Sequence, residues 1–494
     1  MTDSNDQPTE GFSRRAAREG STKAVSSGGP INGLRTLIAK HPTAWLFSAL
    51  GVVFLLLATG AVFAGIASGS GKADAVPLPT ESVPPPRPQP SAVPAGTHLR
   101  TCSIASAASQ ANLGTLAASV LNATTGEVLF DRSGSSAATP ANVTQLLTAA
   151  SAIKILGAGT QLSTKVVLGS SAGTIVLVGG GDPTLATTPD SVYEGAPLIS
   201  DLASQAMAAY NAKYPGNSAP ITQIVLDTSL WNATDNWDAS WPASERANGY
   251  TPFITPLMVD GDRDDPTDPE GARGEDPVMR AAQAFASAAG LSGVTFSTGT
   301  AIGATTLAEV KSQPISTLVG QMLLNGDNAL AEMLARVMSK RAQFDGSSAS
   351  IAQMIPATLK DLGLDTTGLK IADGSGESAN DQVPPKLIAQ LLVKVKANES
   401  DLGAIYSGMA VAGESGNLYD RFSGDNAVAS GKVLGVTGWI TNARSLAGII
   451  NAADGTPLAF AFYGLGDAIS TDTKEALDTL ATAAYTCGDN LSNN

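Results

Sequence analysis

Residues 139–151, with the sequence Thr-Pro-Ala-Asn-Val-Thr-Gln-Leu-Leu-Thr-Ala-Ala-Ser, predict the start of a buried helix. Pro140 suits the first position of a helix, because its fixed φ is already helical and its missing N–H is not needed there. An apolar run without a charged side chain follows. We therefore expect the globular part of the chain to be organised around this helix.

A second apolar segment lies near the N-terminus. Residues 41–71 contain no Asp, Glu, Lys or Arg, and residues 44–66 supply about the 20 apolar positions that a membrane span needs. Basic side chains precede it: Arg14, Arg15, Arg18, Lys23, Arg35 and Lys40. The positive-inside rule then predicts a cytoplasmic N-terminus. The alternative is a cleaved signal peptide with Ala73-Asp-Ala75 as its cleavage site, but the long preceding tail favours an uncleaved anchor.

These features divide the N-terminal region into three parts. Residues 1–42 predict a disordered cytoplasmic tail, residues 43–68 a transmembrane anchor, and residues 69–100 a proline-rich linker. Residues 76–94 contain eight prolines, which favour a semi-rigid spacer that holds the next domain away from the membrane. We therefore expect a single-pass protein of the cell membrane with an extracytoplasmic globular domain.

Composition excludes several kinds of function. A net charge of −14 argues against nucleic acid or anionic lipid as a partner of the folded part. Both histidines, His41 and His98, lie outside the expected globular region, which argues against a histidine metal site or a Ser-His-Asp triad. Asp260 and Asp262 begin an alternating acidic pattern like that of a calcium loop, but no Glu follows at the twelfth position. We expect a solvated loop there, and neither a metal nor a cofactor.

The two cysteines, Cys102 and Cys487, stand at opposite ends of the expected globular region. They are either a disulfide that joins the two ends in an oxidising compartment or two unrelated buried thiols. The first interpretation is favoured, because both positions lie just inside the apparent limits of the domain.

The pattern of elements predicts an α+β fold with a sheet built from both ends of the chain. Apolar alternation and turn residues predict strands at 116–128 (a hairpin), 165–169, 174–178, 221–227, 434–440, 445–450 and 458–463. Helices are predicted at 200–214, 278–290, 315–340, 350–362, 385–398 and 473–485.

A series of short segments in this order resembles the D-alanyl-D-alanine carboxypeptidases of the penicillin-binding protein 4 (DacB-like) family. It comprises Pro140-Ala141, Leu146–Ala149, Leu177–Leu185, Asp327-Asn328, Ala331-Glu332, Asp373–Gly376, Val383–Pro385, Val411–Gly416, Thr437-Gly438 and Ser445–Gly448. The resemblance implies a penicillin-recognising, beta-lactamase-like fold, with an antiparallel sheet covered by helices. It also implies that residues 101–164 and 277–490 form the carboxypeptidase-like domain and that residues 165–276 form an inserted domain.

The same resemblance implies three catalytic motifs, and each one is altered here. The family's Ser-x-x-Lys has Asn142 and Gln145 in the positions of the nucleophile and its base. Its Ser-x-Asn has Gly326 and retains Asn328, and its Lys-Thr-Gly has Val436 before Thr437 and Gly438. An asparagine amide is not a nucleophile.

No neighbouring residue is expected to replace the missing groups. Thr144 should point away from Asn142 round the helix, while Lys154 lies about 18 Å along its axis. Lys432 precedes Val436 by about 13 Å of strand. Ser375 belongs to a loop that the resemblance marks as structural.

Two functional interpretations remain. The first is a catalytically inactive protein of peptidoglycan metabolism that binds a stem peptide or a cell-wall protein, with Asn328, Thr437 and Gly438 as binding residues. The second is an active serine-type carboxypeptidase or endopeptidase with unorthodox catalytic residues. Because both motif lysines are absent, we expect the cleft no longer to select a D-alanine carboxylate, although Thr437 can still donate to one and Arg444 lies near the same strand end.

Overall fold

The computed structural model describes residues 98–232, 234–467 and 469–493. The predicted cytoplasmic tail, the transmembrane anchor and all but the last three residues of the linker lie outside these ranges. Within them, no helix is long and apolar enough to cross a membrane.

The main sheet is antiparallel and has the order β12-β11-β10-β9. Its strands are β9 (Ala410–Val411), β10 (Val433–Ile440), β11 (Ala443–Asn451) and β12 (Pro457–Leu465). The hairpin of β2 (Thr115–Asn122) and β3 (Val128–Arg132) continues it beside β12, where the backbone N–H of Ala123 donates to the carbonyl of Pro457 at 2.8 Å. The structure thus builds one layer from both ends of the globular part, as predicted.

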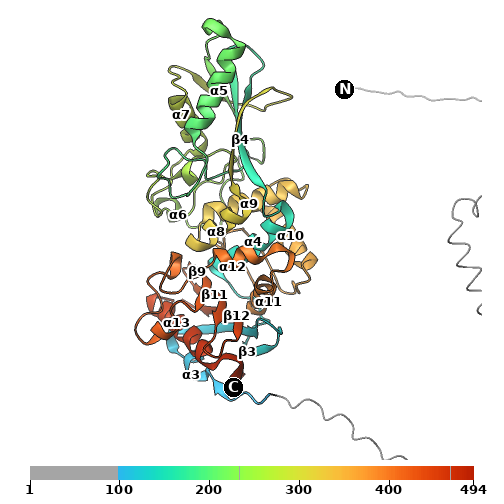
Figure 1. Ribbon diagram of the computed structural model, residues 1–494, viewed down its shortest axis with the longest axis vertical. Coiled ribbons are helices and arrows are strands. Elements are labelled where there is room, and N and C mark those ends of the chain that lie inside the picture. The colour runs from blue at the N-terminus through green and yellow to red at the C-terminus, as the bar shows by residue number, and fades with distance from the viewer. Residues whose placement is uncertain (1–97, 233, 468, 494) are drawn as a thin grey trace, which may run out of the picture. The chain divides into compact units, whose positions relative to one another are not determined.

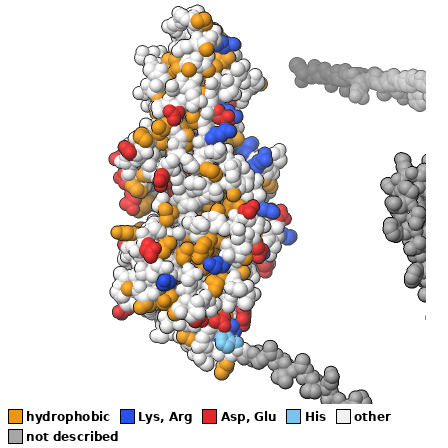
Figure 2. Space-filling view, viewed as in Figure 1, with side chains coloured by type: hydrophobic (Ala, Val, Ile, Leu, Met, Phe, Trp, Pro, Cys, Tyr) orange, Lys and Arg blue, Asp and Glu red, His pale blue; other side chains and the backbone are white. Residues whose placement is uncertain are grey.

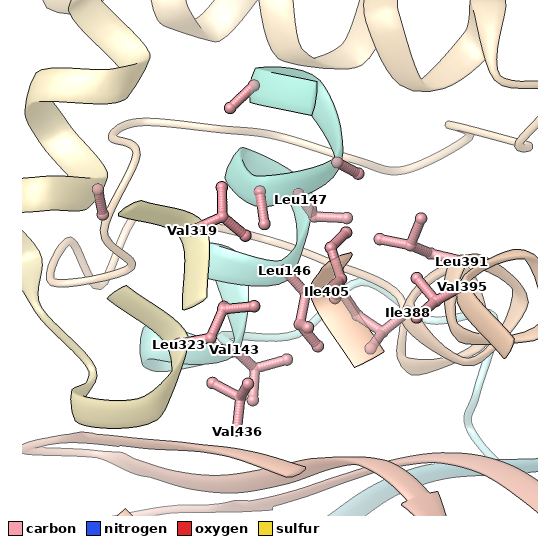
Figure 3. Close-up of a cluster of buried hydrophobic side chains, with 14 of the residues drawn as sticks. Val143, Leu146, Leu147, Val319, Leu323, Ile388, Leu391, Val395, Ile405 and Val436 are labelled. Atoms are coloured by element: carbon pink, nitrogen blue, oxygen red, sulfur yellow. The ribbon is translucent and has the colours of Figure 1, made fainter. Parts of the chain in front are cut away.

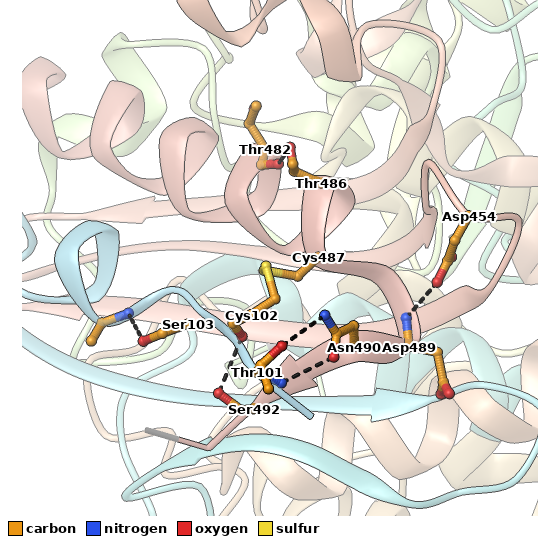
Figure 4. Close-up of a disulfide and its surroundings, with 11 residues drawn as sticks. Thr101, Cys102, Ser103, Asp454, Thr482, Thr486, Cys487, Asp489, Asn490 and Ser492 are labelled. Atoms are coloured by element: carbon orange, nitrogen blue, oxygen red, sulfur yellow. Dashed lines mark hydrogen bonds between the residues drawn. A yellow bond between two sulfur atoms is a disulfide. The ribbon is translucent and has the colours of Figure 1, made fainter. Parts of the chain in front are cut away.

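The two ends are also joined directly. Strand β1 (Cys102–Ser103) pairs in parallel with β13 (Leu491–Ser492), and Cys102 forms a disulfide with Cys487 (Figure 4). Cys487 is the last residue of α13 (Thr471–Cys487), which packs on β11 and β12 together with the short α3 (Ala105–Ala108).

Helix α4 (Gln145–Leu156) is buried at the centre of the largest apolar core, which confirms the buried helix predicted from residues 139–151, but it begins at Gln145 and not at Pro140. It follows a short 3-10 turn at Ala141–Thr144. The helices around it are α8 (Ile315–Asn325), α9 (Asn328–Arg341), α10 (Ser348–Asp361), α11 (Pro385–Lys396) and α12 (Gly403–Gly408). Figure 3 shows Leu146 and Leu147 of α4 between Val319 of α8 and Leu391 of α11.

The single helix expected over residues 315–340 is wrong, because the chain breaks at Gly326 and Asp327. Gly326 ends α8 in the left-handed conformation (φ +66°), which glycine adopts without steric cost. The Asp327 side chain then accepts from the backbone N–H of Leu330 and begins α9 as its N-cap. The break turns Asn328 into the first residue of a helix.

A second, five-stranded sheet lies between residues 161 and 314, in the order β7-β6-β5-β4-β8 (Figure 1). Its strands are β4 (Gln161–Leu168), β5 (Thr174–Val178), β6 (Gln223–Asp227), β7 (Thr295–Thr298) and β8 (Thr306–Pro314). Helices α5 (Ile199–Lys213) and α7 (Pro277–Ala288) pack against it, and α6 (Ser244–Ala247) is a single turn.

This second sheet extends beyond the limits of 165 and 276 that we predicted for the inserted domain. Strands β7 and β8 were not expected, because the helical patterns after residue 277 dominated the prediction. The polar side chains of β8 alternate with the buried Ala308 and Val310, which is the period of a strand with one covered face. The domain limits stay a prediction.

The acidic segment 260–276 is not simply a solvated loop, which corrects the expectation. Asp260 and Asp262 are buried, whereas Asp264 is exposed. Asp260 accepts hydrogen bonds from Thr187, and Arg280 Nε lies 2.9 Å from Asp262 Oδ1. Basic residues within and after the segment make this burial possible. On the face shown in Figure 2, acidic side chains gather at the left edge near mid-height, and basic side chains lie mainly on the right side at the same height.

Candidate functional site

A cavity of about 1240 Å³ lies where the main sheet, the start of α9 and the loops of residues 240–273 meet. Five of the residues predicted for the site line it: Asn142, Gly326, Asn328, Thr437 and Gly438. The two others, Gln145 and Val436, are fully buried behind its wall. The structure therefore brings all three altered motifs together.

Asn142, which we predicted to stand in place of a catalytic serine, has both ends of its side chain occupied. Its Nδ2 donates to Asn328 Oδ1 at 2.8 Å and lies 3.4 Å from the backbone carbonyl of Ser375. Its Oδ1 accepts from the backbone N–H of Trp439 at 3.3 Å. The amide thus ties the start of α4 to α9, to the loop at Ser375 and to β10.

Asn328 is the centre of a neutral amide cluster. Its Oδ1 also accepts from Gln145 Nε2 at 3.1 Å, and its Nδ2 donates to Thr251 and to Glu377 Oε2. Gln145 Oε1 has no hydrogen-bond partner among the described residues, although it is buried. Two neutral amides therefore occupy the positions that we predicted for the nucleophile and its base, and an amide does not act as a proton acceptor at neutral pH.

Glu377 and Thr251 belong to this cluster and were missed by the sequence analysis. Burial, followed by the nearby charges of Glu245 and Asp373, raises the pKa of Glu377 to about 8. At neutral pH this carboxyl group is mostly protonated and presents no full negative charge to the cleft. Its position directly after Asp373–Gly376 was the signal that could have found it.

Val436 and Gly438 share the face of β10 that packs on the start of α4. Val436 lies below Val143 and near Leu323 in the apolar core (Figure 3). A β-carbon at Gly438 would lie 2.7 Å from the backbone nitrogen of Asn142, so the two segments are in direct contact. Val436 therefore fills the space beneath the site with an apolar side chain and leaves no cation there.

The residues considered as substitutes do not reach the site. Thr144 is buried, and its hydroxyl lies 3.4 Å from Asp381 Oδ2 instead of facing the cavity. Lys154 and Lys432 are exposed and do not line the cavity. Ser375 is buried in a loop whose backbone N–H groups donate to Glu332 and Asp373, which agrees with a structural role.

One buried ion pair connects the cavity to the acidic segment. Arg263 lies 3.1 Å from Asp327 Oδ2, and Tyr193 donates to the same oxygen at 3.0 Å. The guanidinium of Arg263 also stacks 4.9 Å from the Tyr193 ring. Burial raises the pKa of Tyr193 to about 12, so it remains a neutral donor. Asp327 stands inside the second motif, which makes this contact part of the site wall.

Comparison with known proteins agrees with this geometry. The family model of D-Ala-D-Ala carboxypeptidase 3 (S13) matches residues 101–290 and 263–484. Carboxypeptidase DacB of Mycolicibacterium smegmatis is 30% identical over 471 residues, covering 91% of this chain and 99% of that protein. A carboxypeptidase of Mycobacterium tuberculosis is 29% identical over 398 residues, covering 78% of this chain and 84% of that protein.

Among solved structures, penicillin-binding protein 4 (dacB) from Haemophilus influenzae matches with a TM-score of 0.60 at 19% identity. The match covers 75% of this chain and 95% of that one. At 19% identity this structural similarity supports a shared fold and nothing more. The predicted α+β fold of the penicillin-binding type is confirmed for the globular part.

Proposed function

Because the chain belongs to the D-Ala-D-Ala carboxypeptidase 3 (S13) family, we propose that it is a catalytically inactive member that acts by binding. The observation that carries the proposal is the amide cluster of Asn142, Gln145 and Asn328. Acyl transfer by this family's chemistry needs an activated hydroxyl, a base and a cation. The corresponding positions hold an amide, a second amide and a valine.

The hydroxyl of Ser445, close to Asn142 beside Gly438, does not offer a replacement. Ser445 lies on β11 opposite Gly438, but its side chain is buried and donates to the carbonyl of Pro140 at 2.5 Å. No lysine or histidine within the described residues is hydrogen-bonded to it, so nothing is placed to take its proton. Losing one member of a cooperating catalytic set can cost on the order of 10⁶ in rate in serine proteases.

Covalent labelling tests the proposal directly. The full-length protein is incubated with a fluorescent penicillin and then analysed by intact-mass spectrometry, with an active family member as the positive control. We expect no added mass, and also none in the single variant Asn142→Ser, because Gln145 and Val436 still lack the charges that activate a serine. An acyl adduct on the unmodified chain would instead establish the alternative, an active peptidase with unorthodox residues.

The ligand class that best fits the family is a stem peptide of peptidoglycan, and a cell-wall protein is the second candidate partner. Both require the globular part to lie outside the cytoplasm. The apolar segment 44–66, the basic residues before it and the proline spacer after it support a single-pass anchor in this orientation. Protease treatment of intact cells should then digest the globular part, whereas a reporter fused to the N-terminus should stay protected.

A further inference from the structure

Five cationic side chains line the cavity within the described residues: Arg263, Arg273, Arg421, Arg444 and Lys474. Three of them face a carboxylate. Arg263 pairs with Asp327, Arg421 with Asp478 and Lys474 with Asp420.

Arg273 donates to the backbone carbonyls of Gly249 and Gly261. Arg444 differs from the other four, because none of the described residues accepts a hydrogen bond from its side chain or pairs with it as an anion. Its Nε is buried and has no partner. Arg444 is therefore a cation in a partly desolvated place without a counter-charge, which is costly unless something supplies one.

The orientation of Arg444 is set by a tryptophan. The two residues lie opposite each other in the pairing of β10 and β11, and the guanidinium carbon is 4.4 Å from the centre of the Trp439 ring. Trp439 is 57% exposed, so protein does not cover its ring completely. A guanidinium that stacks face-on against a ring still has its N–H groups free at its edge. There they can donate two parallel hydrogen bonds to a carboxylate.

This cation is not in the place of the missing motif lysine. Trp439 follows Val436 by three strand residues, which is about 10 Å along β10. The turn between β10 and β11 contributes Thr441 and Asn442 to the cavity wall beside it. The unpaired positive charge of the cleft therefore lies at the end of the hairpin and not beneath the amide cluster.

We propose that Arg444, held by Trp439, binds the carboxylate of a peptide ligand at the mouth of the cleft. This inference rests on the proposed binding function and names the group that the cleft recognises. Since the carboxylate would sit away from Asn328 and Thr437, those residues should contribute little to affinity. This contact also agrees with the expectation that the cleft does not select a D-alanine carboxylate. Arg444 would recognise the charge of the carboxylate, whatever the configuration of the last residue.

The test compares a peptide acid with its amide. The full-length protein in mild detergent is titrated with N-acetyl-Lys-D-Ala-D-Ala, with its C-terminal amide and with the L-Ala-L-Ala acid, and binding is followed by saturation-transfer NMR. We expect both acids to bind with millimolar affinity and at least about tenfold more tightly than the amide, as for a hydrogen-bonded charge.

Variants assign that preference to a residue. Arg444→Gln should remove the difference between acid and amide, and Arg444→Lys should retain only part of it. Lys474→Gln, which removes a paired cation from the same cavity, is the matched control and should keep the difference. If Arg444→Gln does not fold, Trp439→Leu replaces it, because loss of the stacking partner should also weaken the preference.

Two failures can be told apart. Equal binding of acid and amide, or an acid preference that survives Arg444→Gln, overturns the assignment of Arg444 and leaves the proposed function untouched. Release of free alanine from the acid during the titration, detected by mass spectrometry, contradicts the proposed function instead.

Discussion

At the scale of residues, the side-chain amide of Asn142 is held by hydrogen bonds at both of its ends. Its amide oxygen accepts the backbone N–H of Trp439, a donor on β10 that opens toward the cavity. In acyl-transfer enzymes, backbone N–H groups beside the nucleophile stabilise the oxyanion that develops in the transition state. In this structure the backbone N–H of Trp439 already donates to Asn142 Oδ1, so this donor is not free to stabilise an oxyanion.

Glu377 makes stability depend on pH. Burial and the neighbouring Glu245 raise its pKa to about 8, whereas an unfolded glutamate has a pKa of about 4.3. The folded state therefore binds more protons than the unfolded state between about pH 4.5 and 8, and the free energy of unfolding falls as pH rises through this window. We expect Glu377→Gln to reduce the loss of Tm between pH 5 and pH 8 in differential scanning fluorimetry.

Glu270→Gln is the control for this prediction, because Glu270 lines the same cavity but is exposed. It should leave the pH dependence as in the unmodified protein. Burial and Asp373 also raise the pKa of Glu332 to about 8, so part of the slope should persist in Glu377→Gln. Identical slopes for Glu377→Gln and the unmodified protein would show that Glu377 is not protonated in the fold.

At the scale of elements, the break between α8 and α9 connects two regions of the protein. Asp327 begins α9 as its N-cap and also receives Arg263 and Tyr193 from the segments that precede α7. One carboxylate therefore fixes both the direction of the helix that presents Asn328 and the position of the acidic segment. The residues near the second sheet are in this way coupled to the wall of the cleft.

Asp327→Asn should lower stability strongly. The amide can still cap α9, but Arg263 would keep a buried charge without a counter-ion, which typically costs about 3–5 kcal/mol. Urea unfolding followed by tryptophan fluorescence measures the change. The matched control is Asp276→Asn in the exposed N-cap of α7, where Asp276 accepts from Met279 and a loss of about 1 kcal/mol or less is expected. Equal effects of the two substitutions would mean that the ion pair adds nothing beyond the cap.

At the scale of the whole globular part, the chain closes on itself. The hairpin of β2 and β3 lies beside β12, β1 pairs with β13, and the Cys102–Cys487 disulfide spans 385 residues of sequence. Such a covalent link restricts the unfolded chain more than the folded one, and the effect grows with the length of the closed loop.

Free-thiol labelling of the denatured, unreduced protein should detect no cysteine thiol. Substituting both cysteines by serine should lower the free energy of unfolding by about 2–5 kcal/mol. A double variant controls for an unpaired thiol, which the single substitutions would leave. Two reactive thiols in the unreduced protein would contradict the bond.

The parts that could be predicted rest on local signals. Pro140 and the apolar run after it indicated the buried helix, and the strand patterns near both ends indicated a shared sheet. Strands β7 and β8 were missed because helical patterns dominate the sequence after residue 277. One helix was predicted where Gly326 and Asp327 separate two. The acidic segment was predicted to be solvated because sequence does not show that Arg263 and Arg280 fold back to neutralise it.

The sequence by itself determined the residue types at positions 142, 145, 326 and 436, and none of these side chains is a nucleophile, a base or a cation. Only the tertiary structure decided what these residues contact. The partners of Asn142 come from α9, the loop at Ser375 and β10, while Asp478 and Asp420 pair with Arg421 and Lys474 and not with Arg444. Hydrogen bonds and ion pairs join residues that are hundreds of positions apart, and no local pattern records such contacts.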